Sequence, residues 1–296
     1  MNDLTAPSQT AAEWLARGQQ HLERGERALA AEALRHALQD RETRLTAHQL
    51  IEQHTLPGAF SQMMGLNCEI SRADDIFRFF EGHPSSTNPL RDYLADGWRT
   101  LSELMVLLEA VDRPLLKTRH FMEFASGHGR FTRHLVKALG AERVTVSDVV
   151  PDAMQFAQGT FGVRSVLSST VPEDVVWDQK YDVVFVLSLF SHLPRRTWSR
   201  WLQCLYEGVA PGGVLVFSTH GLKAAAHDSV PLDDEGFFFA PSSESQAIDV
   251  QEYGTAFTSE AFVLARIAET VGMDRLIHRV PVHFWNHQDA YVLAKP

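Results

Sequence analysis

The hydrophobic pattern from about residue 118 to the C-terminus alternates short apolar runs with amphipathic stretches. The apolar runs end near residues 124, 148, 167, 188 and 219. One amphipathic stretch contains Phe131, Leu135 and Leu139 and stops at Gly140. Strands that alternate with helices predict a parallel sheet covered by helices on both faces. Two final apolar runs, about 275–284 and 290–294, are joined through 285–288 and predict a closing hairpin.

The N-terminal part is predicted to be helical throughout. Residues 11–44 have helical periodicity, and further helix is expected through Ile51 and in 59–80. A dense cluster of turn-forming residues at 82–89 predicts a domain boundary. We therefore expect a helical extension over 1–88 and an α/β domain over 89–296, the latter opened by a long amphipathic helix that covers the sheet.

Residues 11–44 resemble one tetratricopeptide repeat. The large and small residues that carry this resemblance are Trp14, Gly18, Gly25, Ala30, Leu34 and Ala37. Such repeats normally stack in series, and one repeat is visible here. The hairpin is therefore interpreted as packing on the α/β domain or on a partner chain, including a second copy in a homodimer. A peptide-binding module is the alternative.

The first predicted strand runs into a glycine loop, Glu123-Phe124-Ala125-Ser126-Gly127-His128-Gly129. A helix, a second strand and then Asp148 follow. This is the order by which a βαβ unit holds a nucleoside-bearing cofactor. Small residues let the backbone approach the ligand, and the helix N-terminus offers unpaired N–H groups. Asp148, about twenty residues after the turn, is placed to accept both ribose hydroxyls.

The details of the loop distinguish between cofactors. A dinucleotide fingerprint needs a third small residue three positions after the second glycine, but Thr132 stands there, beside the bulky Phe131. Glu123 would repel a pyrophosphate and suits a ligand that carries an ammonium group and a sulfonium. An NAD-dependent enzyme built on the same sheet remains the alternative.

Residues 118–296 resemble the class I S-adenosylmethionine-dependent methyltransferases. Their first motif, acid-x-small-x-Gly-x-Gly, matches Glu123, Ala125, Gly127 and Gly129, with Ala125 in place of the more usual glycine. Residues 181–188 and 210–217 are similar to the fourth strand and to the turn and fifth strand of the family. The resemblance implies S-adenosylmethionine as cofactor and a Rossmann-like, seven-stranded, mostly parallel sheet with an antiparallel last strand.

The resemblance also implies which residues contact the cofactor. They are Glu123, Ala125, Ser126, Gly127, Gly129, Asp148, Val149, Ser168, Ser169, Leu187 and Ser188. After the third strand the family often has an acid near the adenine amino group. This chain has Ser168, Ser169 and Thr170 there, whose hydroxyls can serve as hydrogen-bond partners.

Candidate catalytic residues are expected beyond the carboxyl ends of the strands, where open α/β sheets bind ligands. His220, at the tip of the predicted fifth strand, is the first candidate for a general base. His192 is the second and His287 the third. The segment 222–257 is too long for a simple connection and predicts a lid, to which Tyr253 contributes a hydroxyl.

Three adjacent phenylalanines, Phe237–Phe239, lie within this predicted lid. They cannot all face one core on a strand, so at least one is expected to cover ligand or domain surface. Closure over the acceptor and contact with the N-terminal helices are both left open by the sequence.

The predicted reaction is transfer of a methyl group to a hydroxyl, or less readily an amine, of a small molecule, without a metal. A net charge of −10 argues against nucleic acid as a substrate. The chain has no run of eighteen apolar residues and no signal-peptide pattern, and Cys68 and Cys204 are expected to be reduced thiols of a cytoplasmic protein. A non-enzymatic interaction protein that uses the helical hairpin is the second alternative.

Overall fold

The computed structural model describes residues 9–243, 245 and 248–296. The chain divides into two compact units, Met1–Arg72 (unit 1) and Ala73–Pro296 (unit 2). The sequence placed the boundary at 88, after the helix α5 (Asp75–Gly82). In the structure α5 belongs to unit 2, because Phe77 is fully buried and its ring lies 5.6 Å from that of Tyr93.

Unit 1 begins with an antiparallel helical hairpin, as predicted for this region. Its described helices are α1 (Ala11–Glu23), α2 (Arg27–Ala37), α3 (Arg41–Gln53) and α4 (Phe60–Met64). A capping box between Thr10 and Glu13 starts α1. A Cβ added to Gly18 would lie 2.6 Å from Leu34 Cδ2, so this glycine lets α1 and α2 approach closely. The resemblance to a tetratricopeptide repeat stays a prediction.

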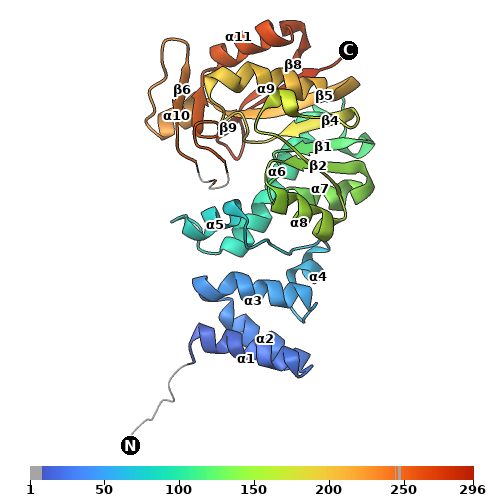
Figure 1. The fold of residues 1–296 in the computed structure, drawn as a ribbon, viewed down its shortest axis with the longest axis vertical. Coiled ribbons are helices and arrows are strands. Elements are labelled where there is room, and N and C mark those ends of the chain that lie inside the picture. Colours follow the sequence, from blue (N-terminus) through green and yellow to red (C-terminus); the bar gives the residue numbers. More distant parts are fainter. Residues whose placement is uncertain (1–8, 244, 246–247) are drawn as a thin grey trace, which may run out of the picture. The chain divides into compact units, whose positions relative to one another are not determined.

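A seven-stranded sheet forms the centre of unit 2 within the described residues (Figure 1). Its strands are β1 (Phe121–Phe124), β2 (Val144–Asp148), β3 (Arg164–Leu167), β4 (Tyr181–Val186), β5 (Val209–His220), β8 (Leu276–Phe284) and β9 (Gln288–Ala294). Their spatial order is β3-β2-β1-β4-β5-β9-β8. The pairs from β3 to β5 are parallel, whereas β9 is antiparallel to both β5 and β8. This confirms the predicted Rossmann-like sheet with an antiparallel last strand.

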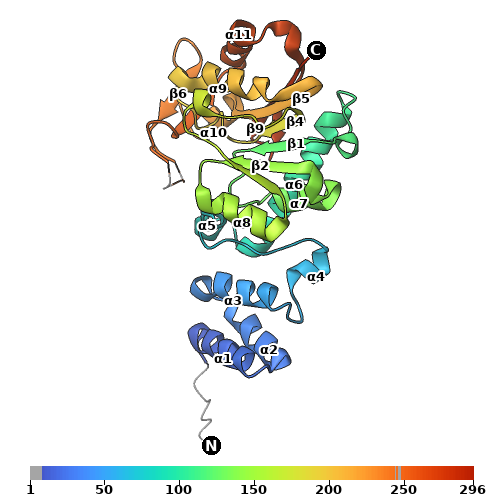
Figure 2. The ribbon, with the colours of Figure 1, turned by 45° about the vertical axis from the view of Figure 1, so that its right-hand side comes forward.

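Helices cover both faces of the sheet (Figures 1 and 2). They are α6 (Pro89–Glu109), α7 (Thr132–Leu139), α8 (Pro151–Phe161), α9 (Arg195–Glu207) and α11 (Glu260–Thr270), with 3₁₀ turns at Leu115–Lys117, Ala141–Arg143, Pro172–Asp174 and Met273–Arg275. Alternate residues of β4 enter different cores. Val183 and Phe185 pack with α6, α7 and α8, while Val184 and Val186 pack with α9 and α11.

The segment predicted as a lid contains α10 (Leu222–His227) and a small antiparallel sheet of β6 (Phe237–Ala240) and β7 (Thr255–Thr258). The phenylalanines of β6 point to alternate sides. Phe237 and Phe239 join the core under α9 and α11, and Phe238 packs near Phe257 beside α10. All three therefore pack within unit 2. The sequence had left open contact with ligand or with the N-terminal helices.

No helix among the described residues is sufficiently long and apolar to span a membrane.

Candidate active site

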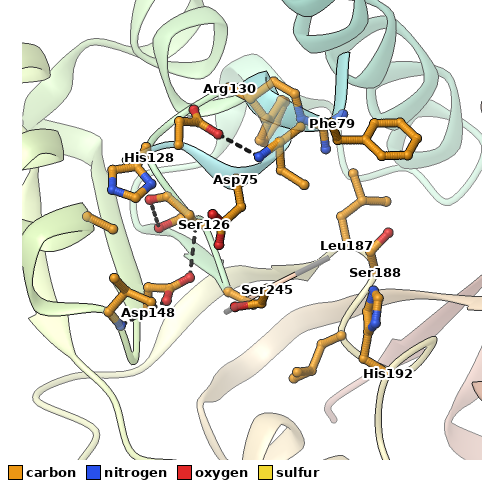
Figure 3. Close-up of a pocket in the computed structure, with 18 of the residues that line it drawn as sticks. Asp75, Phe79, Ser126, His128, Arg130, Asp148, Leu187, Ser188, His192 and Ser245 are labelled. Atoms are coloured by element: carbon orange, nitrogen blue, oxygen red, sulfur yellow. Dashed lines mark hydrogen bonds between the residues drawn. The ribbon is translucent and has the colours of Figure 1, made fainter. Parts of the chain in front are cut away.

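A cavity of about 1090 Å³ lies at the carboxyl ends of the parallel strands in unit 2 (Figure 3). Its volume exceeds the roughly 300–1,000 Å³ of ordinary small-molecule sites. Its walls come from the glycine loop, the ends of β2, β4 and β5, the helix α5, the turn between β8 and β9, and Tyr253. A cavity of this size, at this edge of an α/β sheet, can hold a cofactor and a second small molecule together.

The glycine loop presents its backbone to this cavity. Ala125 and Gly127 both have left-handed backbone conformations, with φ of 59° and 54°, and both line the cavity. A Cβ added to Gly127 would meet no atom within 4 Å. Open space therefore stands in front of this part of the main chain, where a ligand can approach it closely.

Gly129 has a packing role instead. It is not among the described residues that line the cavity, and a Cβ added to it would lie 2.3 Å from Phe161 Cε2. Its φ of 84° also favours glycine. Gly129 therefore allows the start of α7 to approach α8, which fixes the shape of the loop.

Asp148 ends β2 and faces the glycine loop across the cavity wall. The backbone N–H of Gly127 donates to Asp148 Oδ2 (2.9 Å), and that of Val150 donates to Oδ1 (3.0 Å). Burial raises the pKa of Asp148, and these backbone hydrogen bonds oppose the shift. The carboxylate is thus held at the place where the sequence predicted a ribose-binding acid.

Glu123 is a buried carboxyl with 5% exposure that lines the cavity. Thr132 Oγ1 donates to Glu123 Oε2 (2.6 Å). Burial raises the pKa of Glu123 to about 8; the hydrogen bond from Thr132 opposes this shift, and the nearby charge of Asp148 adds to it. A cationic ligand group beside Glu123 would stabilise its charged form.

The other residues assigned to a cofactor also line the cavity. They are Ala125, Ser126, Val149, Ser168, Ser169, Leu187 and Ser188. Ser168 Oγ is buried and has no hydrogen-bond partner among the described residues. A buried hydroxyl without a partner is costly, so a ligand that bonds to it would remove that cost.

Ser188 belongs to a hydrogen-bond network that joins three strand ends. The backbone N–H of Ser188 donates to Ser218 Oγ (2.9 Å), which donates to Gln288 Oε1 (2.6 Å). Gln288 Nε2 donates back to Ser188 Oγ (2.7 Å). Ser188 also has a left-handed φ of 63°. The network fixes this conformation and the edge of the cavity between β4, β5 and β9.

The three candidate histidines and Tyr253 come together on the cavity wall. The ring centroid of His220 lies 6.3 Å from that of His192 and 5.1 Å from that of His287. The His192 ring stacks on Tyr253 at 4.3 Å and 11°. Among the described residues, no group of three or more His, Cys, Asp or Glu side chains is arranged to hold a metal ion.

The environments of the histidines differ. His192 Nδ1 lies 2.6 Å from the carbonyl oxygen of Gly254, and because a carbonyl only accepts, Nδ1 carries the hydrogen. The lone pair of the neutral ring is then on Nε2. Burial, followed by the charges of His192 and His287, lowers the pKa of His220 to about 3, and burial also lowers the pKa of His287.

Residues 122–215 match the family model described as a methyltransferase domain. The matched segment includes the glycine loop, Asp148 and the whole of β4, and it ends within β5. The similarity to a methyltransferase domain therefore covers about a third of the chain. No curated protein matches the chain in sequence.

Several solved structures are also similar to this chain. The apo form of the S-adenosylmethionine-dependent methyltransferase SibL is 16% identical (TM-score 0.49) over 94% of this chain and 77% of its own. Magnesium protoporphyrin IX methyltransferase from Synechocystis, with bound S-adenosylhomocysteine, is 14% identical (TM-score 0.48) over 75% and 94%. The 1,6-didemethyltoxoflavin-N1-methyltransferase of Burkholderia thailandensis is 17% identical (TM-score 0.45) over 69% and 81%. At these TM-scores the likenesses do not bear on the activity of this chain.

The sequence did not reveal the wall that α5 and α6 contribute to the cavity. Asp75, Ile76 and Phe79 line the cavity from α5, and Asp96 from α6 pairs there with Arg130. The run of 76–80 does carry a signal. Besides the buried Phe77 it places three more apolar side chains on the helix, which exceeds what one packed face requires.

A buried network connects α5 to the glycine loop. Asp74 caps α5 and accepts a hydrogen bond from Tyr93 Oη (2.5 Å), which in turn accepts from Arg133 Nη2 (3.5 Å). Arg133 Nε donates to the carbonyl oxygen of Gly129 (3.1 Å). The wall that sequence reasoning missed is therefore attached to the loop that it predicted.

Proposed function

We propose that the protein transfers a methyl group from S-adenosylmethionine to a hydroxyl, or less readily an amine, of a small molecule. The observation that carries this proposal is that the carboxyl groups of Glu123 and Asp148 both lie beside an open glycine loop, in the segment that matches a methyltransferase domain. When bound, the cofactor would supply a methyl group activated by its sulfonium.

The residues present fit this cofactor. The carboxyl of Glu123, buried without a basic partner that lowers its pKa, suits the ammonium group of the methionine part. Asp148, already held by two backbone N–H groups, keeps lone pairs for the two ribose hydroxyls. The hydroxyl of Ser168, which has no partner among the described residues, suits the adenine edge.

We infer that His192 accepts the proton of the acceptor. As the oxygen of the acceptor forms its bond to the methyl group, the O–H bond would break and the proton would pass to His192 Nε2. The S–CH3 bond of the bound cofactor would break in the same displacement, so that S-adenosylhomocysteine leaves as a neutral thioether. The hydrogen bond from Nδ1 to Gly254 and the stacking on Tyr253 hold the ring in one orientation. Holding the nucleophile in line with the methyl group can contribute about 7–11 kcal/mol, and a base adds roughly 10²–10⁴-fold.

His220, the first candidate from the sequence, is less suited to this task. With a pKa of about 3 the ring stays neutral near pH 7 and is a weak base towards a hydroxyl. We propose that His220 and His287 act as neutral hydrogen-bonding groups beside the acceptor, and that Tyr253 positions His192.

The two alternatives are less well supported. A dinucleotide enzyme would place a pyrophosphate beside Glu123, and the match of residues 122–215 is to a methyltransferase domain. For the helical hairpin of unit 1, docking of a second copy or of a protein partner remains a proposal. A cytoplasmic location also remains a proposal.

Calorimetric titration with S-adenosylmethionine, S-adenosylhomocysteine and NAD tests the proposal. We expect both sulfur ligands to bind and NAD to give no heat of binding. Binding of NAD alone would favour the dinucleotide enzyme, and binding of none of the three would favour the interaction protein. Because the readout is binding, the test does not require the acceptor to be known.

A further inference from the structure

The helix α5 carries an apolar wall that faces the cavity. Ile76, Phe79 and Phe80 all line it. Phe79 remains 50% exposed, although α5 itself is fixed by the burial of Phe77 and by the cap of Asp74. A large apolar ring that a fixed helix holds open at a cavity is typical of a surface that a ligand covers.

A second wall lies at the end of β4. Figure 3 shows Ser126, His128 and Asp148 on one side of the cavity and Phe79, Leu187 and His192 on the other. Phe79 and His192 therefore lie away from the predicted cofactor residues of the loop, and Leu187, itself assigned to the cofactor, lies between them. The parallel stack of His192 on Tyr253 adds a flat ring surface to this side.

The guanidinium groups that line the cavity lie beside carboxylates, which does not favour an anionic acceptor. Every guanidinium group that lines it in the described part of the chain has a carboxylate partner. Arg78 pairs with Asp75 (3.9 Å), Arg91 with Asp92 (2.7 Å) and Arg130 with Asp96. Recognition of a carboxylate or phosphate normally uses an available guanidinium fork.

The imidazoles on the same wall do not replace such a fork. Burial lowers the pKa of both His220 and His287, which favours their neutral forms. Neutral rings accept and donate hydrogen bonds but supply no positive charge.

We infer that the methyl acceptor is an uncharged, ring-containing hydroxy compound held between the apolar side chains of α5 and the stacked His192–Tyr253 pair. The inference rests on the proposed function and deepens it, because it names the class of substrate and the residues that select it. Phe79 and Ile76 are the specificity-determining side chains.

To test this inference, the protein is first saturated with S-adenosylhomocysteine. It is then titrated separately with 2-naphthol and with 2-naphthoate. The two probes share one ring system, but one carries a neutral hydroxyl and the other a carboxylate. Binding is followed by quenching or a shift of the naphthol fluorescence. We expect the protein to bind 2-naphthol with an affinity at least about tenfold higher than its affinity for 2-naphthoate. Equal or tighter binding of 2-naphthoate would overturn the inference.

Two variants locate the site. Phe79→Ala is expected to weaken 2-naphthol binding at least about tenfold while the affinity for S-adenosylhomocysteine stays unchanged. Ile76→Ala should act in the same direction. The control Val106→Ala, at a 65% exposed position of α6 outside the cavity, should change neither affinity. An unchanged 2-naphthol affinity in both α5 variants would also refute the assignment.

The outcomes separate this inference from the proposed function. Failure of S-adenosylhomocysteine to bind the unaltered protein contradicts the proposed function itself. Normal binding of that ligand with a preference for 2-naphthoate contradicts only the substrate class. The melting temperatures of both variants show whether they fold. The comparison of the two probes on the unaltered protein decides the charge preference even if a variant does not fold.

Discussion

Gly127 and Gly129 lie two residues apart but are expected to respond to alanine in opposite ways. Both have a left-handed φ, of 54° and 84°. A Cβ at Gly127 meets open space, whereas a Cβ at Gly129 would lie 2.3 Å from the ring of Phe161. Gly127→Ala should therefore mainly impair ligand binding, and Gly129→Ala should mainly impair stability.

The magnitudes follow from these geometries. The left-handed conformation costs a residue with a Cβ roughly 1–2 kcal/mol, which is the whole expected loss for Gly127→Ala. Gly129→Ala adds overpacking against Phe161 of about 1–3 kcal/mol, so its total is about 2–5 kcal/mol. For a domain the size of unit 2 each kcal/mol lowers the melting temperature by about 2–4 °C.

Thermal unfolding and calorimetric titration with S-adenosylhomocysteine measure the two effects separately. Gly212→Ala is the matched control, because Gly212 has a φ of 78°, no atom within 4 Å of an added Cβ, and no place in the cavity wall. We expect Gly127→Ala and Gly212→Ala to lose similar stability, but only Gly127→Ala to bind at least about tenfold more weakly. Unchanged affinity in Gly127→Ala, or equal losses of affinity in both, would refute the position of the cofactor.

Three further predictions concern the cavity and its supports. Asp148→Asn removes the charge of a hydrogen-bond acceptor, which is worth about 1.5–3 kcal/mol. Calorimetry should therefore give a roughly 10–100-fold weaker affinity for S-adenosylhomocysteine, and an unaltered affinity would contradict the ribose contact. The raised pKa of Glu123 means that the native state keeps a proton between pH 4.5 and 8 that the unfolded chain has lost, so this group's contribution to stability is complete below pH 4.5 and declines as the pH rises to 8. Urea unfolding between pH 5 and 8 should show that the free energy of unfolding falls by up to about 1.4 kcal/mol per pH unit, and Glu123→Gln should abolish this fall. The same dependence on pH in both proteins would contradict the raised pKa of Glu123. Gly97→Ala would place a Cβ 2.2 Å from the carbonyl oxygen of Arg130, and it should lower the free energy of unfolding by about 1–3 kcal/mol; an unchanged melting temperature would contradict that packing.

Much of the fold, and the place of the glycine loop and Asp148 on the cavity wall, could be predicted from the sequence, because the decisive signals are local. The glycine loop and Asp148 belong to one βαβ unit, whose geometry depends on residues close together in the chain. The alternation of strands and helices likewise predicted a parallel sheet covered by helices, and the family resemblance implied the antiparallel last strand.

The acceptor side could not be predicted in the same way, because it depends on contacts between distant segments. The place of α5 is set by the hydrogen bond between Asp74 and Tyr93, nineteen residues apart. The turn-rich cluster at 82–89 suggested a domain boundary but joins two helices of one unit, since turn composition does not reveal what packs on either side. The environment of His220 depends on burial and on neighbours from other elements, which no local pattern encodes.

The buried Asp74–Tyr93–Arg133 network has a consequence for how two ligands would affect each other. Hydrogen bonds between these buried side chains join the cap of α5 to the carbonyl oxygen of Gly129. A compound that immobilises the helix thereby restrains the loop as well, and binding equilibria are reciprocal. If binding of one ligand raises the affinity for the other by some factor, binding of the other raises the affinity for the first by the same factor.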